Sequence, residues 1–356
     1  MESTDTRRNA LIQQVITDHT ESHRMPRLWC PPITHYDEGG DAPGAIDAAR
    51  TRAHWRTLVG HVGGFLTPGS TGDGWEMSAA EIHALLQIAT DLAVELDTLV
   101  LVGVLRTEVD AMRTVIEETV AWLMAETGEQ DPLTALRARH VAGFTICPPK
   151  GAALSQAQIR VALERVLDLG LPMAIYQLPQ VTGNEISIEV FQDLAARYPN
   201  FLLFKDTSGQ DHVPLADRGE SGVFLVRGAE GNYARWLRET GGPYQGLLLS
   251  TANCFAAELA EVIARLEAGR IAEARALSQR LTAVVEAAFA AVADLQTGNA
   301  FSNANKAMDH FMAYGPDAAE VPPPVCHGGV QLPRDLIAKI GALLEAHGFM
   351  PREAYL

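Results

Sequence analysis

A lysine at the end of a short apolar run is the first residue in this sequence whose type and position suggest chemistry. Lys205 follows Phe201–Phe204 and precedes Asp206–Gly209. Lysine is rare in this chain, with four copies among 28 basic residues, so each lysine merits attention. A lysine amine that burial keeps unprotonated is a nucleophile that forms imines with ketones. The sequence therefore makes Lys205 a candidate imine-forming residue, with a structural ion pair to Asp206 as the alternative.

Two further segments carry groups that suit a ligand with a carboxylate. Gly69–Gly74 combines small residues with two hydroxyls, those of Ser70 and Thr71. Small residues let backbone amides approach a ligand, and amides beside hydroxyls can hold a carboxylate. Tyr176 ends another apolar run and is followed by Gln177–Pro179, so its phenol could face the same ligand. Taken alone, the first segment could equally be a plain loop and Tyr176 a packing residue.

These residues lie at or just beyond the ends of short apolar runs, which alternate with helix-length amphipathic stretches. The runs that we interpret as strands are Leu28–Cys30, Gly63–Thr67, Thr98–Val104, Val141–Cys147, Met173–Leu178, Phe201–Lys205, Val223–Arg227 and Gly246–Ser250. Between them, helices are predicted at Ser78–Leu96, which opens with the capping box Ser78–Glu81, and at Ser155–Leu169, which is followed by Gly170.

Eight strands that alternate with helices predict an α/β fold of the (β/α)8, or TIM barrel, type. A doubly wound sheet gives the same alternation, but its nucleotide-binding form needs a GxGxxG motif. Neither that motif nor a Walker A motif occurs in the sequence. Because active sites of such barrels lie at the carboxyl ends of the strands, we expect Lys205, Tyr176 and Gly69–Gly74 to meet there.

The sequence divides into an N-terminal extension (1–26), a barrel (27–254) and a C-terminal helical region (255–356). The extension is polar, with one weakly amphipathic stretch at Leu11–Ile16. The C-terminal region is Ala-rich and helical from Phe255 to about Leu295, irregular over Gly315–Pro333, and helical again at Arg334–His347. A polar insertion, Glu126–Leu133, is predicted to be a surface loop.

At four places the sequence resembles the dihydrodipicolinate synthase/N-acetylneuraminate lyase family of class I, Schiff-base aldolases. Gly69–Asp73 is similar to that family's GTTGE or GSTGE loop, and Tyr176–Gly183 to its YNxPxxTG segment. Lys205–Gly209 resembles the family's K-[DEQ]-x-[ST]-G Schiff-base segment, and Gly246–Asn253 its GxISxxxN strand. The motifs occur in the family's order and spacing, and the resemblance runs from about residue 29 to residue 346.

The resemblance implies a role for each matching residue. Lys205 would form the imine with the C2 carbonyl of a 2-oxo acid such as pyruvate, and Tyr176 would shuttle protons with the Ser70 hydroxyl as a relay. The substrate-binding positions that it implies are Thr71, Gly228, Leu248, Glu230 and Ser250. The last two align with residues that hold sugar hydroxyls in sialic-acid-type members, which favours a hydroxylated or extended 2-oxo acid. Glu230 at a helix start is equally well explained by the helix dipole.

The departures from the family pattern concern the second substrate. Val181 replaces the arginine that binds the second carboxylate in dihydrodipicolinate synthases, so that activity is expected to be absent or very weak. Pro149 and Lys150 stand where those enzymes have two tyrosines, so the proton relay must differ. Lys150 could supply a cation for an acidic substrate group or be a solvated loop lysine. Gln177 replaces the usual asparagine, which is a milder change.

Composition excludes several classes of partner. The net charge of −16 argues against binding to nucleic acid or to an anionic membrane. No apolar run approaches the length of a membrane span, and the first residues lack the apolar region of a signal peptide, so a cytoplasmic protein is expected. The four cysteines form no CxxC pair and the eleven histidines no HExxH motif. We therefore expect reduced thiols, no metal site and no cofactor.

The function that the resemblance implies is a lyase that cleaves or forms the C3–C4 bond of a 2-oxo acid through a lysine imine. Dehydration of a 3-deoxy-2-oxo sugar acid or of a hydroxy-2-oxo acid by the same lysine is one alternative. A barrel that binds a keto acid without turnover is another. The resemblance also implies a homo-oligomer, a tetramer.

Overall fold

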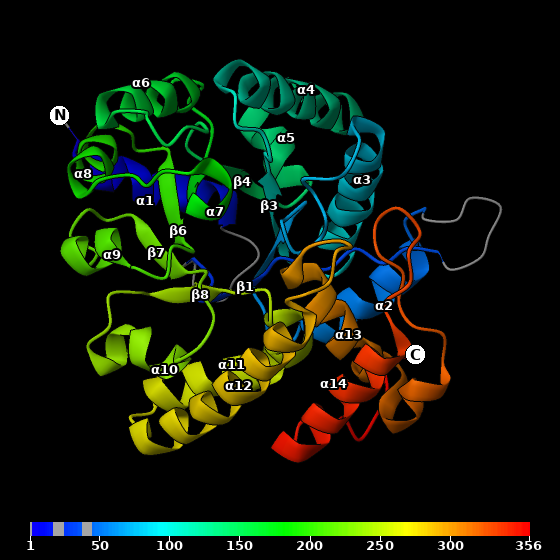
Figure 1. The fold of residues 1–356 in the computed structure, drawn as a ribbon. Coiled ribbons are helices and arrows are strands. Elements are labelled where there is room, and N and C mark those ends of the chain that lie inside the picture. The colour runs from blue at the N-terminus through cyan, green and yellow to red at the C-terminus, as the bar shows by residue number, and fades with distance from the viewer. Residues whose placement is uncertain (1, 17–24, 38–44) are drawn as a thin grey trace.

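Eight parallel strands close into a barrel, in the order in which they follow one another along the chain (Figure 1). The computed structural model describes residues 2–16, 25–37 and 45–356. The strands are β1 (Leu28–Cys30), β2 (Gly64–Thr67), β3 (Leu99–Gly103), β4 (Val141–Ile146), β5 (Met173–Gln177), β6 (Phe201–Asp206), β7 (Phe224–Arg227) and β8 (Gly246–Leu248). Pairing of β1 with β8 closes the cylinder. The predicted (β/α)8 barrel is confirmed, and every strand begins and ends within two residues of its predicted range.

Each strand is followed by one or two helices. These are α2 (Ala48–Leu58), α3 (Ala79–Glu95), α4 (Val109–Thr127) with α5 (Pro132–Ala138), α6 (Gln156–Leu167), α7 (Pro179–Thr182) with α8 (Ile188–Arg197), α9 (His212–Asp217), α10 (Tyr233–Trp236) and α11 (Ala252–Glu267). The predicted capping box of α3 is formed, because Ser78 and Glu81 each accept a backbone hydrogen bond from the other. None of the described helices is both long and apolar enough to cross a membrane.

Half of the predicted loop at Glu126–Leu133 is helical, and for those residues the sequence interpretation was wrong. Glu126 and Thr127 end α4, and Pro132 begins α5, so only residues 128–131 connect the two helices. Asp131 caps α5 by accepting a hydrogen bond from the Thr134 amide, and proline suits the first turn of a helix because that turn needs no N–H donor. A capping aspartate followed by proline was the helix-start signal within this polar stretch.

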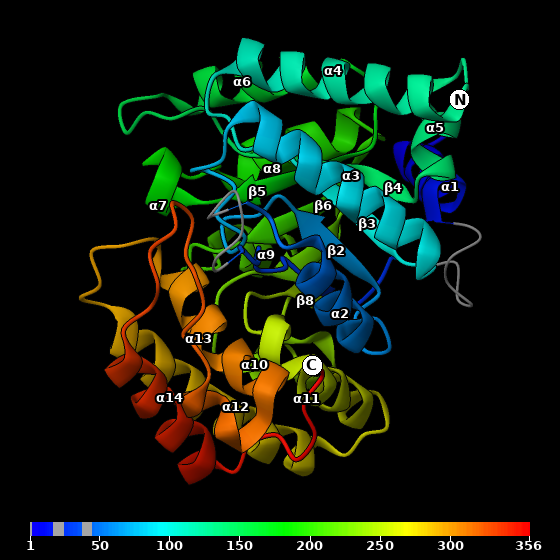
Figure 2. The same cartoon turned by 90° about the vertical axis from the view of Figure 1, so that its right-hand side faces the viewer.

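The N-terminal extension folds as a helix, α1 (Thr4–Ile16), that lies at one end of the barrel (Figure 2). The predicted amphipathic stretch is its second half. Val15 and Ile16 are fully buried and belong to the same apolar cluster as Trp29, Leu101 and Leu202, which come from the strands and fill the barrel. The extension therefore contributes to the barrel interior.

The C-terminal helices are α11, α12 (Ile271–Val292), α13 (Ala300–Tyr314) and α14 (Arg334–His347). The predicted boundary at residue 254 falls inside α11, which packs on β1 and α2 as well as on α12. The last helix occupies its predicted range. The sequence analysis missed α13, which begins at its capping residue Asn299. In Figure 2, α13 and α7 lie toward the end of the barrel opposite α1.

Candidate active site

Lys205 is buried at the carboxyl end of β6. Its side chain is 4% exposed, and its Nζ lies 4.1 Å from the centroid of the Tyr176 ring. Burial lowers the pKa of Lys205 to about 7, an effect that the nearby Glu230 and Cys30 oppose. Since water no longer stabilises the ammonium form, a large fraction of this amine is neutral at physiological pH. The neutral amine is the form that attacks a carbonyl carbon.

Tyr176 comes from the neighbouring strand β5, where it is the register partner of Lys205. Burial raises the pKa of Tyr176 to about 12, although hydrogen bonds with the hydroxyls of Ser70 and Thr207 act in the opposite direction. The phenol is therefore protonated at neutral pH and linked to two other hydroxyl groups. Such a chain can pass protons to and from a reacting group beside Lys205.

The Gly69–Gly74 loop follows β2 and folds back on itself at the same end of the barrel. The Gly72 and Gly74 amides donate to the Gly69 carbonyl at 3.1 and 3.0 Å. The Ser70 hydroxyl accepts a hydrogen bond of 2.9 Å from the Trp75 indole. Ser70 and Thr71 both line the pocket that contains Lys205. The structure thus brings the three predicted catalytic residues together with Thr71.

A buried ion pair ties this loop to the C-terminal helices. Lys306 of α13 donates to the Asp73 carboxylate at 2.7 Å, and both side chains are 2% exposed. Asn299, which caps α13, donates to the Ser70 carbonyl at 3.1 Å. Asp73 has a left-handed backbone, with φ of 61°, which Asp and Asn adopt more readily than most residues. One helix therefore holds both the backbone and a side chain of the loop.

Gly228 follows β7 and leaves space for the lysine. A Cβ atom at this position would lie 2.8 Å from Lys205 Cε and 2.3 Å from Thr207 Cγ2. Only glycine fits without displacing the side chain that carries the amine. The full set of described residues that line the pocket is Pro31, Ser70, Thr71, Tyr176, Leu178, Gln180, Lys205, Thr207, Gly228, Ser250 and Phe301.

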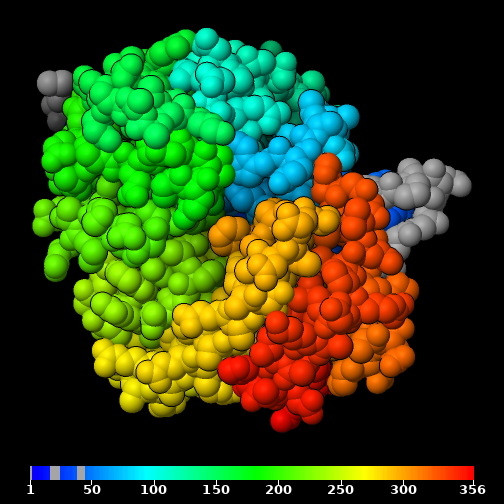
Figure 3. Space-filling model, viewed as in Figure 1, coloured from blue at the N-terminus to red at the C-terminus, as the bar shows by residue number. Residues whose placement is uncertain are grey.

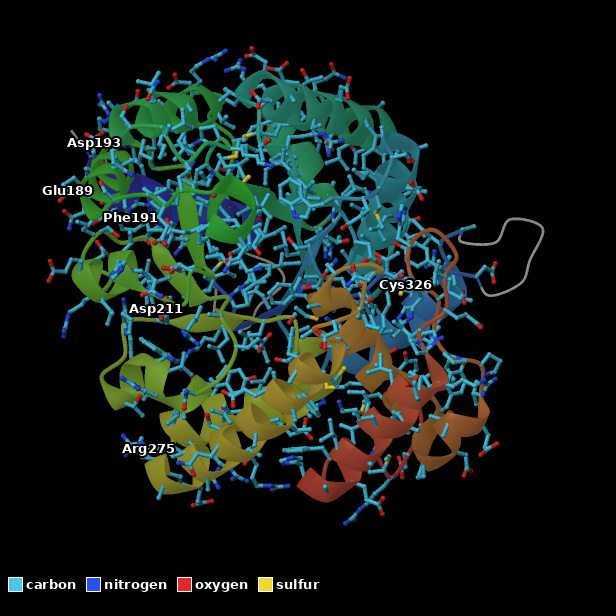
Figure 4. All side chains as sticks on the ribbon, in the orientation of Figure 1. Glu189, Phe191, Asp193, Asp211, Arg275 and Cys326 are labelled. Carbon is cyan, nitrogen blue, oxygen red and sulfur yellow. The ribbon has the colours of Figure 1, made fainter. Side chains whose placement is uncertain are left out.

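A second set of buried polar groups lies near the ends of β6 and β7. Asp206 is fully buried, and burial raises its pKa to about 6. Asp211, labelled in Figure 4, accepts hydrogen bonds from the Arg227 guanidinium and the Tyr244 hydroxyl. These hydrogen bonds tie the segment after β6 to the end of β7 and to the residues before β8.

Glu230 and Ser250 are adjacent, but they are engaged with each other. Glu230 accepts hydrogen bonds from the Ser250 hydroxyl at 2.7 Å, the Thr251 hydroxyl at 2.6 Å, the Thr251 amide at 3.1 Å and the Tyr233 hydroxyl at 3.0 Å. Ser250 lines the pocket, whereas Glu230 is not among the lining residues. Glu230 thus fixes the end of β8 and places a negative charge near Lys205. Substrate binding by these two residues stays a prediction.

The other predicted positions lie outside the pocket lining. The Leu248 side chain is buried in the apolar cluster inside the barrel. Lys150 is exposed on the segment between β4 and α6. Val181 lies on α7, and Gln177 is fully buried, where its amide oxygen accepts a hydrogen bond from the Ile186 amide at 2.8 Å. Gln177 therefore shapes the segment that carries Val181.

Sequence reasoning missed Thr207, Gln180, Phe301, Asn299 and Lys306. Thr207 lies within the motif that begins at Lys205, so its position was a usable signal. Lys306 was marked only by the rarity of lysine. Phe301 and Asn299 are separated from the motifs by long stretches of chain and belong to a helix that was not predicted. Within the described ranges, no group of three or more His, Cys, Asp or Glu side chains is arranged to hold a metal ion.

Comparisons with known proteins agree with this geometry. A model of the dihydrodipicolinate synthetase family matches residues 137–312, from α5 through most of α13. A 4-hydroxy-tetrahydrodipicolinate synthase of Prosthecochloris aestuarii is 33% identical over 116 residues, which are 32% of this chain and 38% of that protein. An uncharacterized DapA-like lyase of Pyrobaculum islandicum is 29% identical over 170 residues, 45% of this chain and 56% of that protein. The chain thus matches only 38% and 56% of the length of these relatives.

Solved structures extend the similarity to the whole fold. The structure of YagE in complex with pyruvate, a prophage protein from E. coli K12 of the dihydrodipicolinic acid synthase family, covers 91% of this chain. The chain covers 99% of YagE in turn, with a TM-score of 0.69 and 18% identity. At this level of identity the likeness establishes the barrel fold, and it gives no information about the reaction. The chain is thus similar to the dihydrodipicolinate synthetase family in sequence over residues 137–312, and it shares the barrel fold of YagE over most of its length.

Proposed function

We propose that the protein is a lyase that forms an imine between Lys205 and a 2-oxo acid and then cleaves or forms the C3–C4 bond of that acid. The observation that carries the proposal is the buried amine of Lys205, with a pKa lowered to about 7, lying 4.1 Å from the Tyr176 ring. The match to the family model and the pyruvate bound to YagE support a pyruvate-type substrate.

Imine formation begins when the neutral Lys205 amine attacks the C2 carbonyl of the substrate. The substrate carboxylate is held by the amides and hydroxyls of Ser70 and Thr71, which line the pocket beside the amine. Loss of water from the adduct needs a proton on the departing oxygen. Tyr176 is protonated at neutral pH and can supply it, and the Ser70 hydroxyl can return a proton to the phenol.

The protonated imine then accepts the electron pair of the breaking bond. In cleavage of a 4-hydroxy-2-oxo acid, the C4 hydroxyl loses its proton, C4 becomes an aldehyde carbon and C3 becomes part of an enamine. Protonation of C3 and attack of water on the imine release pyruvate and regenerate Lys205. Glu230 acts on Lys205 electrostatically, because its charge favours the cationic imine.

Dehydration begins from the same imine. Here a C3 proton leaves and the C4 hydroxyl departs as water, with no carbon–carbon cleavage. A 4-hydroxy-2-oxo acid can follow either course, so its products separate the two reactions: pyruvate with an aldehyde, or an unsaturated 2-oxo acid.

Turnover of 4-hydroxy-2-oxo acids, followed by mass spectrometry of the products, tests the proposal. We expect release of pyruvate by the protein, none by Lys205→Ala, and a rate lower by about 10²–10⁴-fold for Tyr176→Phe, the usual effect of losing a general acid or base. Lys339→Ala is the control, since Lys339 is exposed on α14. Full activity in Lys205→Ala, or binding of the acids without any turnover, would contradict the proposal.

A further inference from the structure

Three of the side chains that line the pocket are apolar. Phe301, Leu178 and Pro31 line it together with the catalytic residues. Phe301 is a large hydrophobic residue on α13 whose side chain is 39% exposed at the pocket. Its ring packs edge-on against Phe289, with 5.5 Å between the ring centroids, and this contact restricts the position of the Phe301 ring.

Three of the polar side chains that line the pocket are already hydrogen-bonded to the protein. The Thr207 hydroxyl donates to the Gln177 carbonyl at 2.6 Å, and the Ser250 hydroxyl donates to Glu230 at 2.7 Å. Gln180 donates one amide hydrogen to the Thr207 carbonyl at 3.0 Å and retains a second. A substrate chain with several hydroxyls would have to displace these bonds, whereas one hydroxyl or carbonyl could pair with Gln180.

The charges of the lining residues also disfavour a charged substituent on the substrate. Of the described residues that line the pocket, Lys205 is the only one with a charged side chain, and its amine is consumed by the imine. Val181 stands outside the lining, and Lys150 is exposed and likewise outside it. A second carboxylate on the substrate would therefore lose hydration without gaining a cation.

We infer that the substituent on C4 of the substrate is uncharged and apolar, with a flat ring such as a phenyl group as the best match to Phe301. The inference rests on the proposed function and names the class of aldehyde that takes part. On this inference the Glu230–Ser250 pair stabilises the end of β8 and does not bind sugar hydroxyls. Figure 3 shows the segment that leads into α13 lying over the centre of this face of the molecule, where such a group would be covered.

The bond changes follow from the proposed reaction and require no other reagent. In the synthetic direction, C3 of the pyruvate enamine on Lys205 attacks the aldehyde carbon, the C3–C4 bond forms, and the aldehyde oxygen takes a proton to become the C4 hydroxyl. Water then releases a 4-hydroxy-2-oxo acid that carries the apolar group on C4. The reverse sequence returns pyruvate and the aldehyde.

Condensation of pyruvate with three aldehydes tests the inference. Benzaldehyde, glyceraldehyde and glyoxylate represent an apolar, a hydroxylated and a charged substituent, and product formation is measured by mass spectrometry. We expect kcat/KM for benzaldehyde to exceed the other two by about tenfold or more, the discrimination that an apolar pocket provides. Phe301→Ser should reduce this preference by about tenfold, and Phe301→Leu should reduce it less.

Val161→Ser is the matched control, because Val161 is also an exposed apolar residue on a helix but lies outside the pocket. It should keep the wild-type preference. A preference for glyceraldehyde or glyoxylate, or a preference that Phe301→Ser leaves unchanged, overturns the inference while the lysine imine stands. If borohydride with pyruvate leaves no adduct on wild-type Lys205, the proposed function itself fails, and the inference fails with it.

Discussion

Burial shifts the pKa values of Lys205 and Tyr176 in opposite directions. At neutral pH the two shifts favour a neutral amine and a protonated phenol. The amine loses its proton easily and the phenol keeps its own, which suits Lys205 to the proposed role of nucleophile and Tyr176 to that of proton donor at the same pH. Neither needs a distant base, because both lie in one pocket with the Ser70 hydroxyl. The division of roles is thus a consequence of where β5 and β6 end.

The pH dependence of imine formation follows from the lowered pKa of Lys205. The neutral amine predominates above pH 7, so the rate of adduct formation should be constant there. Below the pKa it should fall by about tenfold for each pH unit. The measurement is the initial rate of borohydride-trapped pyruvate adduct from pH 5 to pH 9. A half-maximal rate near pH 10, the ordinary value for lysine, would show that burial does not shift this amine.

Gly228→Ala tests how closely the lysine is packed. The new methyl group would lie within 3 Å of Lys205 Cε and Thr207 Cγ2, so the amine must move. Misplacement of a reacting group by about 1 Å costs about 10²-fold in rate, and we expect a loss of that order in single-turnover adduct formation. Gly60→Ala is the control, because nothing lies within 4 Å of a Cβ there. Equal rates in the two variants would be inconsistent with the packing described.

At the scale of elements, α13 is the part of the C-terminal region that completes the site. Asn299 caps this helix and donates to the Ser70 carbonyl, Phe301 lines the pocket, and Lys306 pairs with Asp73. Three residues of one helix thus contact the Gly69–Gly74 loop or the pocket. The C-terminal region therefore contributes directly to the shape of the candidate site.

Lys306→Met should loosen the Gly69–Gly74 loop, which we propose holds the substrate carboxylate. Breaking a buried ion pair on one side costs about 3–5 kcal/mol of stability, because the remaining charge stays buried without a partner. We expect that loss in the free energy of unfolding, together with a KM for pyruvate that rises more than kcat falls. Adding Asp73→Asn should recover part of the stability, since asparagine is neutral and tolerates the left-handed backbone.

The exposed Lys339 of α14 gives the comparison, and Lys339→Met should change neither quantity. A Lys306→Met protein that is as stable as wild type, with an unaltered KM, would rule out this ion pair as the support of the loop. Denaturant unfolding and steady-state kinetics on the same preparations provide both readouts.

Several elements were predictable because they follow local rules. The strands are buried runs bounded by turn residues, and α3 and α6 begin with complete capping boxes. By contrast, α13 is a helix with many polar residues that is buried by its surroundings, including Asn303, Asn305 and Lys306. No local pattern predicts that burial, because the partner of Lys306 is 233 residues away.

The site was predictable to the extent that short motifs carry it. Lys205, Tyr176, Ser70 and Thr71 each lie in a segment whose types suggested chemistry, and the barrel brought them together. The engagement of Glu230 by four protein donors was not foreseeable, since it depends on where Tyr233 and Thr251 lie in space. The position of Cys326, labelled in Figure 4, was likewise not foreseeable: its Sγ lies 3.4 Å from the Asn303 amide oxygen of α13.

At the scale of the whole molecule, the N-terminal helix closes the end of the barrel opposite the site. Arg8 is fully buried and donates to the backbone carbonyls of Phe201 and Ser221, both at 2.9 Å, and to that of Ala195. Phe201 begins β6, the strand that ends in Lys205 and Asp206. The helix therefore anchors the start of the strand that carries the amine. The tetramer that the family resemblance implies stays a prediction, which light scattering at micromolar concentration would test.

Ile16→Ala measures the contribution of this helix. Ile16 is 0% exposed within the barrel cluster, so its truncation should lower the free energy of unfolding by about 2–5 kcal/mol, the usual cost of such a cavity. Gln14→Ala, at an exposed position of the same helix, should have little effect. If both variants unfold at the wild-type denaturant concentration, α1 is not part of the core.

The amine of Lys205 is the centre of the account, and borohydride trapping tests it most directly. The protein is incubated with pyruvate, reduced with borohydride, digested and mapped by mass spectrometry. With four lysines in the chain, the modified peptide identifies the reacting amine without ambiguity. We predict one reduced pyruvate adduct, on the peptide that contains Lys205, and none in Lys205→Ala or Lys205→Arg, because a guanidinium stays protonated and cannot attack a carbonyl. An adduct on Lys150, Lys306 or Lys339 instead, or an unmodified protein, would contradict the account.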